Sequence, residues 1–206
     1  MSEVFKKPIS ELPCFASIPL SEVTVRGNTF TFNEGLEREH VAQLQAYSLD
    51  LNDQSLQQAT SDHERFGTGS YEAWYAKQRI PFTFIEKERN LLAGLIWFGP
   101  KPLGRKSLKH LDAQSRHEEL LQKETMWHTV SYRAYNPFRG TGIMKPLCTR
   151  AIDAYKTLFP SSKLWLSIDT ENEASFGLAE SLGFVRDVAA SVPAEHHYVY
   201  TYTKNI

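Results

Sequence analysis

A glycine-rich turn between an expected strand and an expected helix constrains the fold of this chain more than any other feature. Residues 125–135 are rich in aromatic and β-branched side chains, which favour a strand. Residues 139–142 read Arg-Gly-Thr-Gly, and from 143 to 158 apolar side chains recur at helical spacing. The first N–H groups of such a helix have no acceptor inside it, and the helix dipole adds positive charge there. The junction therefore predicts a phosphate site, to which Arg139 adds a full charge.

The residues after this turn alternate between helix and strand patterns, which predicts a mixed α/β fold. A strand is expected at 163–169. A Thr-x-x-Glu capping-box pattern at 170–173 then opens a helix that ends at Gly183. Two further strands are expected at 184–189 and 196–203. The order implies at least one right-handed parallel crossover.

The first half of the chain has weaker patterns of the same kinds. The elements expected there are a strand at 23–32, a helix at 36–49, a polar connection with a short helix at 50–69, a helix at 71–79 and a hairpin of strands 82–86 and 91–98. No internal repeat is found.

Length and composition are those of a globular domain. The chain has 206 residues, of which 41% are hydrophobic and 23% charged, and these values exclude a disordered or fibrous protein. We expect one domain over residues 1–206, with an arm at 1–22 and an insertion at 101–123 before the fourth strand. A net charge of −1 argues against a protein-wide attraction to nucleic acid or to an anionic membrane.

The insertion at 101–123 has a marked local charge, with six Lys or Arg against three Asp or Glu. A solvated loop is the simplest interpretation of this segment. The alternatives are a substrate loop or an RNA-binding patch, although the segment lacks the interleaved aromatic residues that favour nucleic-acid binding.

The cysteines and the first residues bear on location. Cys14 and Cys148 match no metal or redox spacing, so we expect two free thiols, with Cys148 on the buried stripe of its helix. Residues 1–13 carry charges and lack an apolar stretch, so no signal peptide is expected. The apolar run at 95–98 is far shorter than the roughly 20 residues of a membrane span. These features predict a cytoplasmic protein. Either a monomer or a homodimer is expected.

Three kinds of phosphate site compete for the glycine-rich turn. A Walker-A loop requires GxxxxGK[ST], which the chain lacks. A dinucleotide-binding turn requires GxGxxG, and Lys145 stands where its third glycine would be. Asp169 ends the next strand as a ribose-binding acid would, but it follows Gly142 by about 27 residues rather than about 20. The third kind is a pyrophosphate loop for acetyl-CoA.

Two motifs, in the right order and at the right distance, resemble the GCN5-related N-acetyltransferase (GNAT) family. The family carries [R/Q]-x-x-G-x-[G/A] between a strand and a helix, and residues 139–144 read Arg-Gly-Thr-Gly-Ile-Met. A second family signature is a strand, an Asn and a helix that ends in Leu-Gly-Phe. This chain has Leu-Trp-Leu-Ser-Ile at 164–168, then Asn172, then Leu-Gly-Phe at 182–184. The resemblance covers residues 125–187.

The chain departs from the family pattern at two places. Met144 stands where the family has Gly or Ala, and Pro146 follows it, so the helix must begin near 143 or bend. Many members have a tyrosine, the general acid for the leaving thiolate, where this chain has Ala179.

The resemblance implies one mixed sheet of about seven strands flanked by helices and splayed between the fourth and fifth strands. It implies acetyl-CoA as co-substrate, with its pantetheine bonded by the backbone of 132–134 and one N–H there polarising the thioester carbonyl. The amides of 139–144 would hold the pyrophosphate, and Asn172 would meet the pantetheine arm. The residues implied in cofactor binding are Tyr132, Arg133, Ala134, Arg139, Gly140, Thr141, Gly142, Ile143, Met144, Asn172 and Ser175.

The implied reaction is direct attack of a primary amine on the thioester, which requires the amine to lose a proton. Glu124 and His128 are four residues apart on one strand face, so either is a candidate base. His196 and His197 are weaker candidates, and a chain of water molecules can replace a base. No metal is expected. Alternatives are a CoA-binding sensor or scaffold without chemistry, an RNA-associated protein using 101–123, and a nicotinamide-nucleotide enzyme.

Overall fold

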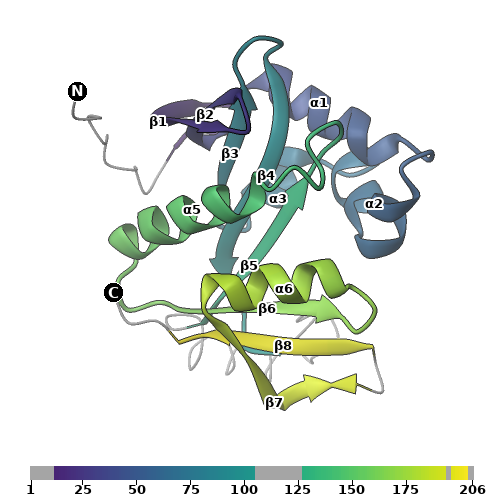
Figure 1. The fold of residues 1–206 in the computed structure, drawn as a ribbon, viewed down its shortest axis with the longest axis vertical. Helices are drawn as coiled ribbons and strands as arrows, with labels where there is room; N and C mark the ends of the chain where they lie inside the picture. Colours follow the sequence, from purple (N-terminus) through teal and green to yellow (C-terminus); the bar gives the residue numbers. More distant parts are fainter. Residues whose placement is uncertain (1–11, 105–126, 194–195, 204–206) are drawn as a thin grey trace. The chain divides into compact units, whose positions relative to one another are not determined.

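The computed structural model describes residues 12–104, 127–193 and 196–203. Eight strands form one sheet in the order β1-β2-β3-β4-β5-β6-β8-β7, so the expected mixed α/β fold is confirmed (Figure 1). The elements are β1 (Ser17–Val25), β2 (Asn28–Gly35), α1 (Arg38–Leu49), α2 (Gln54–Ala59), the π-helical turn η1 (His63–Gly67), α3 (Tyr71–Tyr75), β3 (Ile80–Glu86), β4 (Leu91–Pro100), β5 (Trp127–Ala134), α5 (Met144–Leu158), β6 (Lys163–Asp169), α6 (Glu173–Leu182), β7 (Phe184–Val192) and β8 (His197–Tyr202).

The chain forms two compact units. Unit 1 comprises Met1–Trp97 with Tyr132–Leu158, and unit 2 comprises Phe98–Ser131 with Phe159–Ile206. That both belong to one domain over residues 1–206 stays a prediction. The insertion at 101–123 lies largely outside the described residues, because the description stops at 104 and resumes at 127.

Unit 1 begins with a hairpin that the sequence did not predict. The strand expected at 23–32 is wrong, because Arg26 and Gly27 turn the chain with φ of 49° and 84°. β1 and β2 pair on either side of this turn, from Ser17–Gly35 to Val25–Asn28. The end of the expected arm at 1–22 therefore lies in β1, which accounts for the eighth strand.

The strands of unit 1 are covered on both faces. A Cβ added to Gly94 would lie 3.0 Å from Leu147 and 3.2 Å from Met144, so this glycine lets α5 approach β4 closely. Figure 1 shows α5 crossing these strands. The neighbouring Leu95 points to the opposite face. There it belongs to a core that α1, η1 and α3 complete, with Leu44, Phe66, Trp74 and Trp97 among its members.

The connection expected at 50–69 contains two short elements. Asp53 caps α2 by accepting the N–H of Leu56 at 3.1 Å, and η1 follows at residues 63–67. The helix expected at 71–79 ends at Tyr75 instead. Gln78 adopts a left-handed φ of 57°, which a continuing helix does not allow.

Unit 2 contains the parallel pair of strands. β5 and β6 pair in parallel from Trp127–Lys163 to Thr129–Trp165, and β8 pairs antiparallel with both β6 and β7. Gly183 ends α6 with a φ of 98°, as expected. The predicted capping box at 170–173 is wrong, because Asn172 caps α6 by accepting the N–H of Ser175 at 3.1 Å.

Two further observations concern the whole description. No helix within residues 12–104, 127–193 and 196–203 is both long and apolar enough to span a membrane. Cys14 and Cys148 are both free thiols, and Cys148 is buried in α5, as expected.

Candidate active site

The glycine-rich turn leads directly into α5, as the sequence predicted. Gly140 and Gly142 have φ of 76° and 85°, a backbone conformation that disfavours other residues. The helix begins at Met144, so Pro146 lies in its first turn, where its missing N–H costs nothing. The expected start near 143 is confirmed.

The start of α5 presents unpaired backbone donors. The N–H of Thr141 donates to Phe138 O (3.2 Å) and that of Leu147 donates to Ile143 O (3.1 Å). The N–H groups of Gly142, Ile143 and Met144 find no acceptor in the part of the chain that the structure describes. Three consecutive free amides at the positive end of a helix form an arrangement that binds a phosphate group.

The Arg139 side chain forms an ion pair with Asp53, the residue that caps α2. Its Nη1 and Nη2 atoms donate to Asp53 Oδ1 and Oδ2, both at 2.7 Å, and Nη1 also contacts the Ser55 hydroxyl. This hydrogen-bonded pair lowers the pKa of Asp53 and raises the pKa of Arg139. The guanidinium therefore ties the turn to the cap of α2, and it also donates to Ala134 O at 3.3 Å.

Arg26, which the sequence analysis missed, lies beside the turn. Its guanidinium atoms Nη2 and Nε would lie 3.9 and 4.0 Å from a Cβ built on Gly142. Arg26 is exposed and has no ion-pair partner among the described residues. Sequence analysis could have found Arg26 only by predicting the β1–β2 hairpin, because the turn of that hairpin carries this arginine.

The residues expected to bind pantetheine lie at the end of β5. Tyr132, Arg133 and Ala134 are half-buried and belong to unit 1. The parallel register of β5 with β6 ends at Thr129–Trp165, before β5 reaches this segment. Pairing limited to the first residues of β5 accords with the splay expected between the fourth and fifth strands.

The Arg133 side chain belongs to a buried ionic group that the sequence did not reveal. Its Nε donates to Asp62 Oδ2 at 2.9 Å, and Arg65 Nη1 donates to Asp62 Oδ1 at 2.5 Å. Asp62 is fully buried. Both guanidinium carbons lie over the Trp97 ring, at 5.2 Å for Arg133 and 5.5 Å for Arg65. We call Asp62, Arg65, Arg133 and Trp97 the Asp62 cluster.

The candidate bases are placed unequally. Glu124 lies outside the described residues. His128 is 8% exposed in unit 2, opposite Leu164 of β6, and its ring meets Phe159 edge-on at 5.8 Å. His197 lies at the start of β8. A role as base stays a prediction for each of them.

The residues expected near the pantetheine arm lie at the start of α6. Asn172 uses its side-chain oxygen as the helix cap, and its amide nitrogen has no partner among the described residues. Ser175 contributes the N–H that this cap accepts. Ala179 is fully buried in the same helix, so no tyrosine acid is available there.

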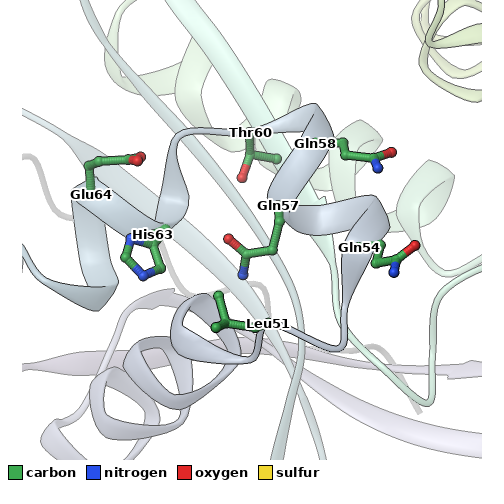
Figure 2. A pocket seen from close by; sticks show the side chains of 7 residues that line it. All are labelled: Leu51, Gln54, Gln57, Gln58, Thr60, His63 and Glu64. Carbon is green, nitrogen blue, oxygen red and sulfur yellow. The ribbon is translucent and has the colours of Figure 1, made fainter.

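A hollow of about 450 Å³ lies elsewhere in unit 1, between α2 and η1 (Figure 2). Figure 2 shows three glutamines from α2 on one side, with His63 and Glu64 from η1 on the other. Gln57 spans part of it by donating to Ser48 O and Asp50 O. The turn η1 thus offers His63 and Glu64 to the hollow, whereas Arg65 belongs to the Asp62 cluster.

Three side chains, Glu37, Glu39 and His40, come close enough to share a metal ion. Asn90 already satisfies two of them, because its amide nitrogen donates to Glu39 (2.7 Å) and its oxygen pairs with His40 Nε2 (3.1 Å). The group is explained as a hydrogen-bonded link between α1 and the β3–β4 turn.

Comparison with known proteins decides the family. A model of the acetyltransferase (GNAT) domain matches residues 36–185, which is well over half of the chain. The chain belongs to the GNAT acetyltransferase family. The search of curated proteins returned no match. The matched span contains the glycine-rich turn, the Asp62 cluster and the start of α6.

Solved structures share the fold of this acetyltransferase. An acetyltransferase from Agrobacterium tumefaciens is 14% identical, with a TM-score of 0.60 over 94% of this chain and 99% of that one. Spermidine N-acetyltransferase from Vibrio cholerae, in complex with CoA and spermine, is 18% identical, with a TM-score of 0.55 over 82% and 92%. The ribosomal-protein-S5-alanine acetyltransferase from Vibrio fischeri is 14% identical, with a TM-score of 0.55 over 84% and 93%.

Proposed function

We propose that this chain transfers the acetyl group of acetyl-CoA to a primary amine. The observation that carries the proposal is the start of α5, where Gly142, Ile143 and Met144 present free N–H groups beside the cation of Arg26. A pyrophosphate is an anion of the right kind for this arrangement. The GNAT family uses acetyl-CoA, which supports acetyl-CoA as the co-substrate of this chain.

The turn and the hairpin have different tasks in this proposal. Within the turn 139–144, the amides of Gly142, Ile143 and Met144 hold the pyrophosphate. Arg26 supplies the positive charge there, because the guanidinium group of Arg139 pairs with Asp53. Arg139 keeps the turn in place through that ion pair. That Asn172 meets the pantetheine arm stays a prediction, and its amide nitrogen has no partner among the described residues.

The segment 132–134 places the reacting group. The register of β5 with β6 ends at Thr129, and we expect an extended pantetheine to hydrogen-bond to the backbone of 132–134 as an added strand would. An N–H of this segment that points at the thioester oxygen stabilises the negative charge that develops there.

The acetyl group passes directly from sulfur to nitrogen. The lone pair of the neutral amine attacks the thioester carbon, the C–N bond forms, and the C–S bond breaks. The sulfur leaves as a thiolate and takes one proton, while the amine nitrogen gives one up. His128 and Glu124 are the proposed bases, and water protonates the thiolate because Ala179 offers no acid.

Acetyl-CoA binding followed by turnover tests the proposal. Isothermal titration detects binding to the full chain, and mass spectrometry of a panel of primary amines detects acetylation. Mass detection is preferred to a thiol reagent, because the partly exposed Cys14 would react with the reagent. Binding together with acetylation supports the proposal, and no binding at millimolar acetyl-CoA contradicts it.

The outcome also separates the rival functions. Binding without acetylation of any amine favours a CoA sensor or scaffold. Salt-dependent binding to RNA without binding to acetyl-CoA favours the alternative based on residues 101–123. The proposed cytoplasmic location draws support from the two free thiols, because a reducing compartment keeps cysteines unpaired.

A further inference from the structure

The Asp62 cluster carries more positive charge than its carboxylate balances. Two guanidinium groups share the single carboxylate of Asp62, which leaves one positive charge over. The side chain of Arg65 is 30% exposed and that of Arg133 is 19% exposed, whereas Asp62 is fully buried. Burial lowers the pKa of Arg65, since a half-buried surplus charge is unfavourable. An anion that reached the exposed side of the cluster would remove this penalty.

A buried hydroxyl group lies beside the cluster without a partner. Tyr135 is 1% exposed, and its Oη has no hydrogen-bond partner among the described residues. Burial raises the pKa of Tyr135 far above its usual value, and the nearby Asp62 charge adds to the effect. The phenol is therefore a permanent donor, and a buried donor without an acceptor is costly. The described residues provide no acceptor oxygen for this hydroxyl group.

A third guanidinium group strengthens the positive field. Arg79 lies close enough for the charge of Arg65 to lower its pKa, in addition to the larger effect of burial. Its Nη1 is buried and has no hydrogen-bond partner in the described ranges. Among the described residues, Asp62 is the carboxylate that pairs with Arg65 and Arg133, and no ion pair links Arg79 to an acid.

The cluster lies next to the segment proposed to hold the pantetheine. Arg133 Nη1 donates to the carbonyl oxygen of Tyr132 at 2.7 Å, so the guanidinium group folds back against the backbone of its own strand. An anion bound by Arg133 is thus within one residue of the backbone that would bond acetyl-CoA. A group in that place belongs to the acceptor rather than to the cofactor phosphates, which the proposed function assigns to the start of α5.

We infer that the acceptor amine carries a carboxylate, which Arg65 and Arg133 bind through their free N–H groups and Tyr135 binds through its hydroxyl. The inference rests on the proposed acetyl transfer and names the substrate class of the same site. A carboxylate fits because its single charge equals the surplus that Arg65 and Arg133 leave over Asp62, and its two oxygens lie in the plane that a guanidinium fork prefers. Free amino acids and short peptides both supply such a group.

The test compares acceptors that differ only in the carboxylate. A set of L-amino acids, their carboxamides and the corresponding glycyl dipeptides is offered with acetyl-CoA to the full chain. The amino group of a carboxamide has a lower pKa, about 8, so more of it is neutral and it is intrinsically the more available nucleophile near neutral pH. We nevertheless expect kcat/KM to be at least about tenfold higher for the acids, because a charge-assisted pair is lost in the amides.

Two substitutions show whether the cluster causes this preference. Arg65→Gln leaves Asp62 paired with Arg133, and Tyr135→Phe removes a hydroxyl that makes no hydrogen bond within the described chain. Each should lower the acid-to-amide ratio of kcat/KM, to about one for Arg65→Gln. A purely structural role would change both acceptors alike and leave the ratio constant. Arg38→Gln, an exposed arginine over the Phe15 ring, is the control and should keep the wild-type ratio.

The outcomes separate this inference from the proposed function. Acids preferred in the wild type and not in Arg65→Gln support it, and a preference for dipeptides assigns the carboxylate to a peptide terminus. Equal rates for acids and amides, or a preference for phosphoethanolamine over both, overturn it while the acetyl transfer stands. If no amine is acetylated, a titration with N-acetyl amino acids that follows the tryptophan fluorescence of the full chain decides. Binding that Arg65→Gln abolishes supports the site, and no binding at millimolar ligand overturns it.

Discussion

The glycine-rich turn and the Asp62 cluster lie in the same unit and are built in opposite ways. The turn offers backbone N–H groups from consecutive residues, 142–144, and needs only left-handed glycines and the start of a helix. The cluster offers side chains from η1, β4 and β5, which come together only in the folded chain. The first kind of site is formed by residues that are consecutive in sequence, and the second depends on packing between residues far apart in sequence.

This difference leads to different responses to substitution. A backbone site fails when a side chain fills it, and the fold survives. A buried ionic site fails together with the fold, because removal of one partner leaves an unbalanced charge in the interior. The following predictions test that contrast, from the largest expected effect to the smallest.

Asp62→Asn is expected to have the largest effect. It leaves the guanidinium groups of Arg65 and Arg133 without their shared carboxylate, and loss of one partner of a buried pair costs about 3–5 kcal/mol. Urea unfolding measures the change in the free energy of unfolding. Asp50→Asn, on the exposed end of α1, is the matched control and should change stability by less than about 0.5 kcal/mol. Equal stability of the two variants would show that the cluster does not behave as a buried ionic site.

Gly142→Asp should abolish acetyl-CoA binding and leave the fold largely intact. The substitution places a carboxylate where the pyrophosphate would lie, within reach of Arg26, and at a φ of 85°. We expect affinity to fall by at least about 100-fold, because a like charge replaces a charge-assisted contact. Gly142→Ala separates backbone strain from charge, and Gly177→Asp adds the same charge to an exposed face of α6. Tight binding by Gly142→Asp would exclude the turn as the phosphate site.

Asp53→Asn tests the ion pair that ties the turn to α2. Asparagine keeps the helix cap, so the variant isolates the Arg139 pair. The pair lies near the surface, and we expect a loss of about 1 kcal/mol near neutral pH. Because the hydrogen bond from Arg139 lowers the folded-state pKa of Asp53, this stabilisation is complete above the unfolded pKa of about 3.9. It disappears as the pH falls through the lower folded value.

The measurement is the difference in unfolding free energy between wild type and Asp53→Asn as a function of pH. The difference should be constant above pH 5 and shrink in more acidic solution. A difference that grows as the pH falls would contradict the assigned sign.

Arg26→Gln should have the smallest effect. An exposed arginine beside the phosphate site contributes about 1 kcal/mol at low salt, which is roughly a fivefold change in the affinity for acetyl-CoA. Salt screens such a contact, so the difference from wild type should narrow as ionic strength rises. Lys77→Gln, an exposed cation after α3, should leave the affinity unchanged at every salt concentration. A larger effect of Lys77 would place the phosphates elsewhere.

The parts of the fold that follow from local pattern were predictable. The helical stripe of α5, the strand β6 and the left-handed Gly183 each depend on neighbours in sequence, and each lies where the pattern indicates. The β1–β2 hairpin was not predictable in this way. Its turn at Arg26 and Gly27 interrupts a run of strand-forming residues, and Arg-Gly is a weaker turn signal than Asn-Gly.

The candidate site likewise has parts that follow from local sequence and parts that depend on long-range contacts. The sequence placed the free amides of the turn correctly, because the start of a helix always leaves N–H groups unpaired. It assigned Arg139 the task of charge neutralisation, whereas Asp53, far away in sequence, takes up that side chain. Nothing local marks Asp62 as the partner of Arg133, so the cluster appears only when η1 packs against β5.

Hydrogen exchange measured by mass spectrometry tests the central claim most directly, because it locates each ligand on the chain. Addition of CoA to the full chain should slow exchange in peptides that cover 139–147, since the amides of Gly142, Ile143 and Met144 would gain acceptors. Peptides that cover η1 should remain unchanged with CoA and become protected with an N-acetyl amino acid. Saturating CoA that leaves 139–147 unprotected would contradict the account.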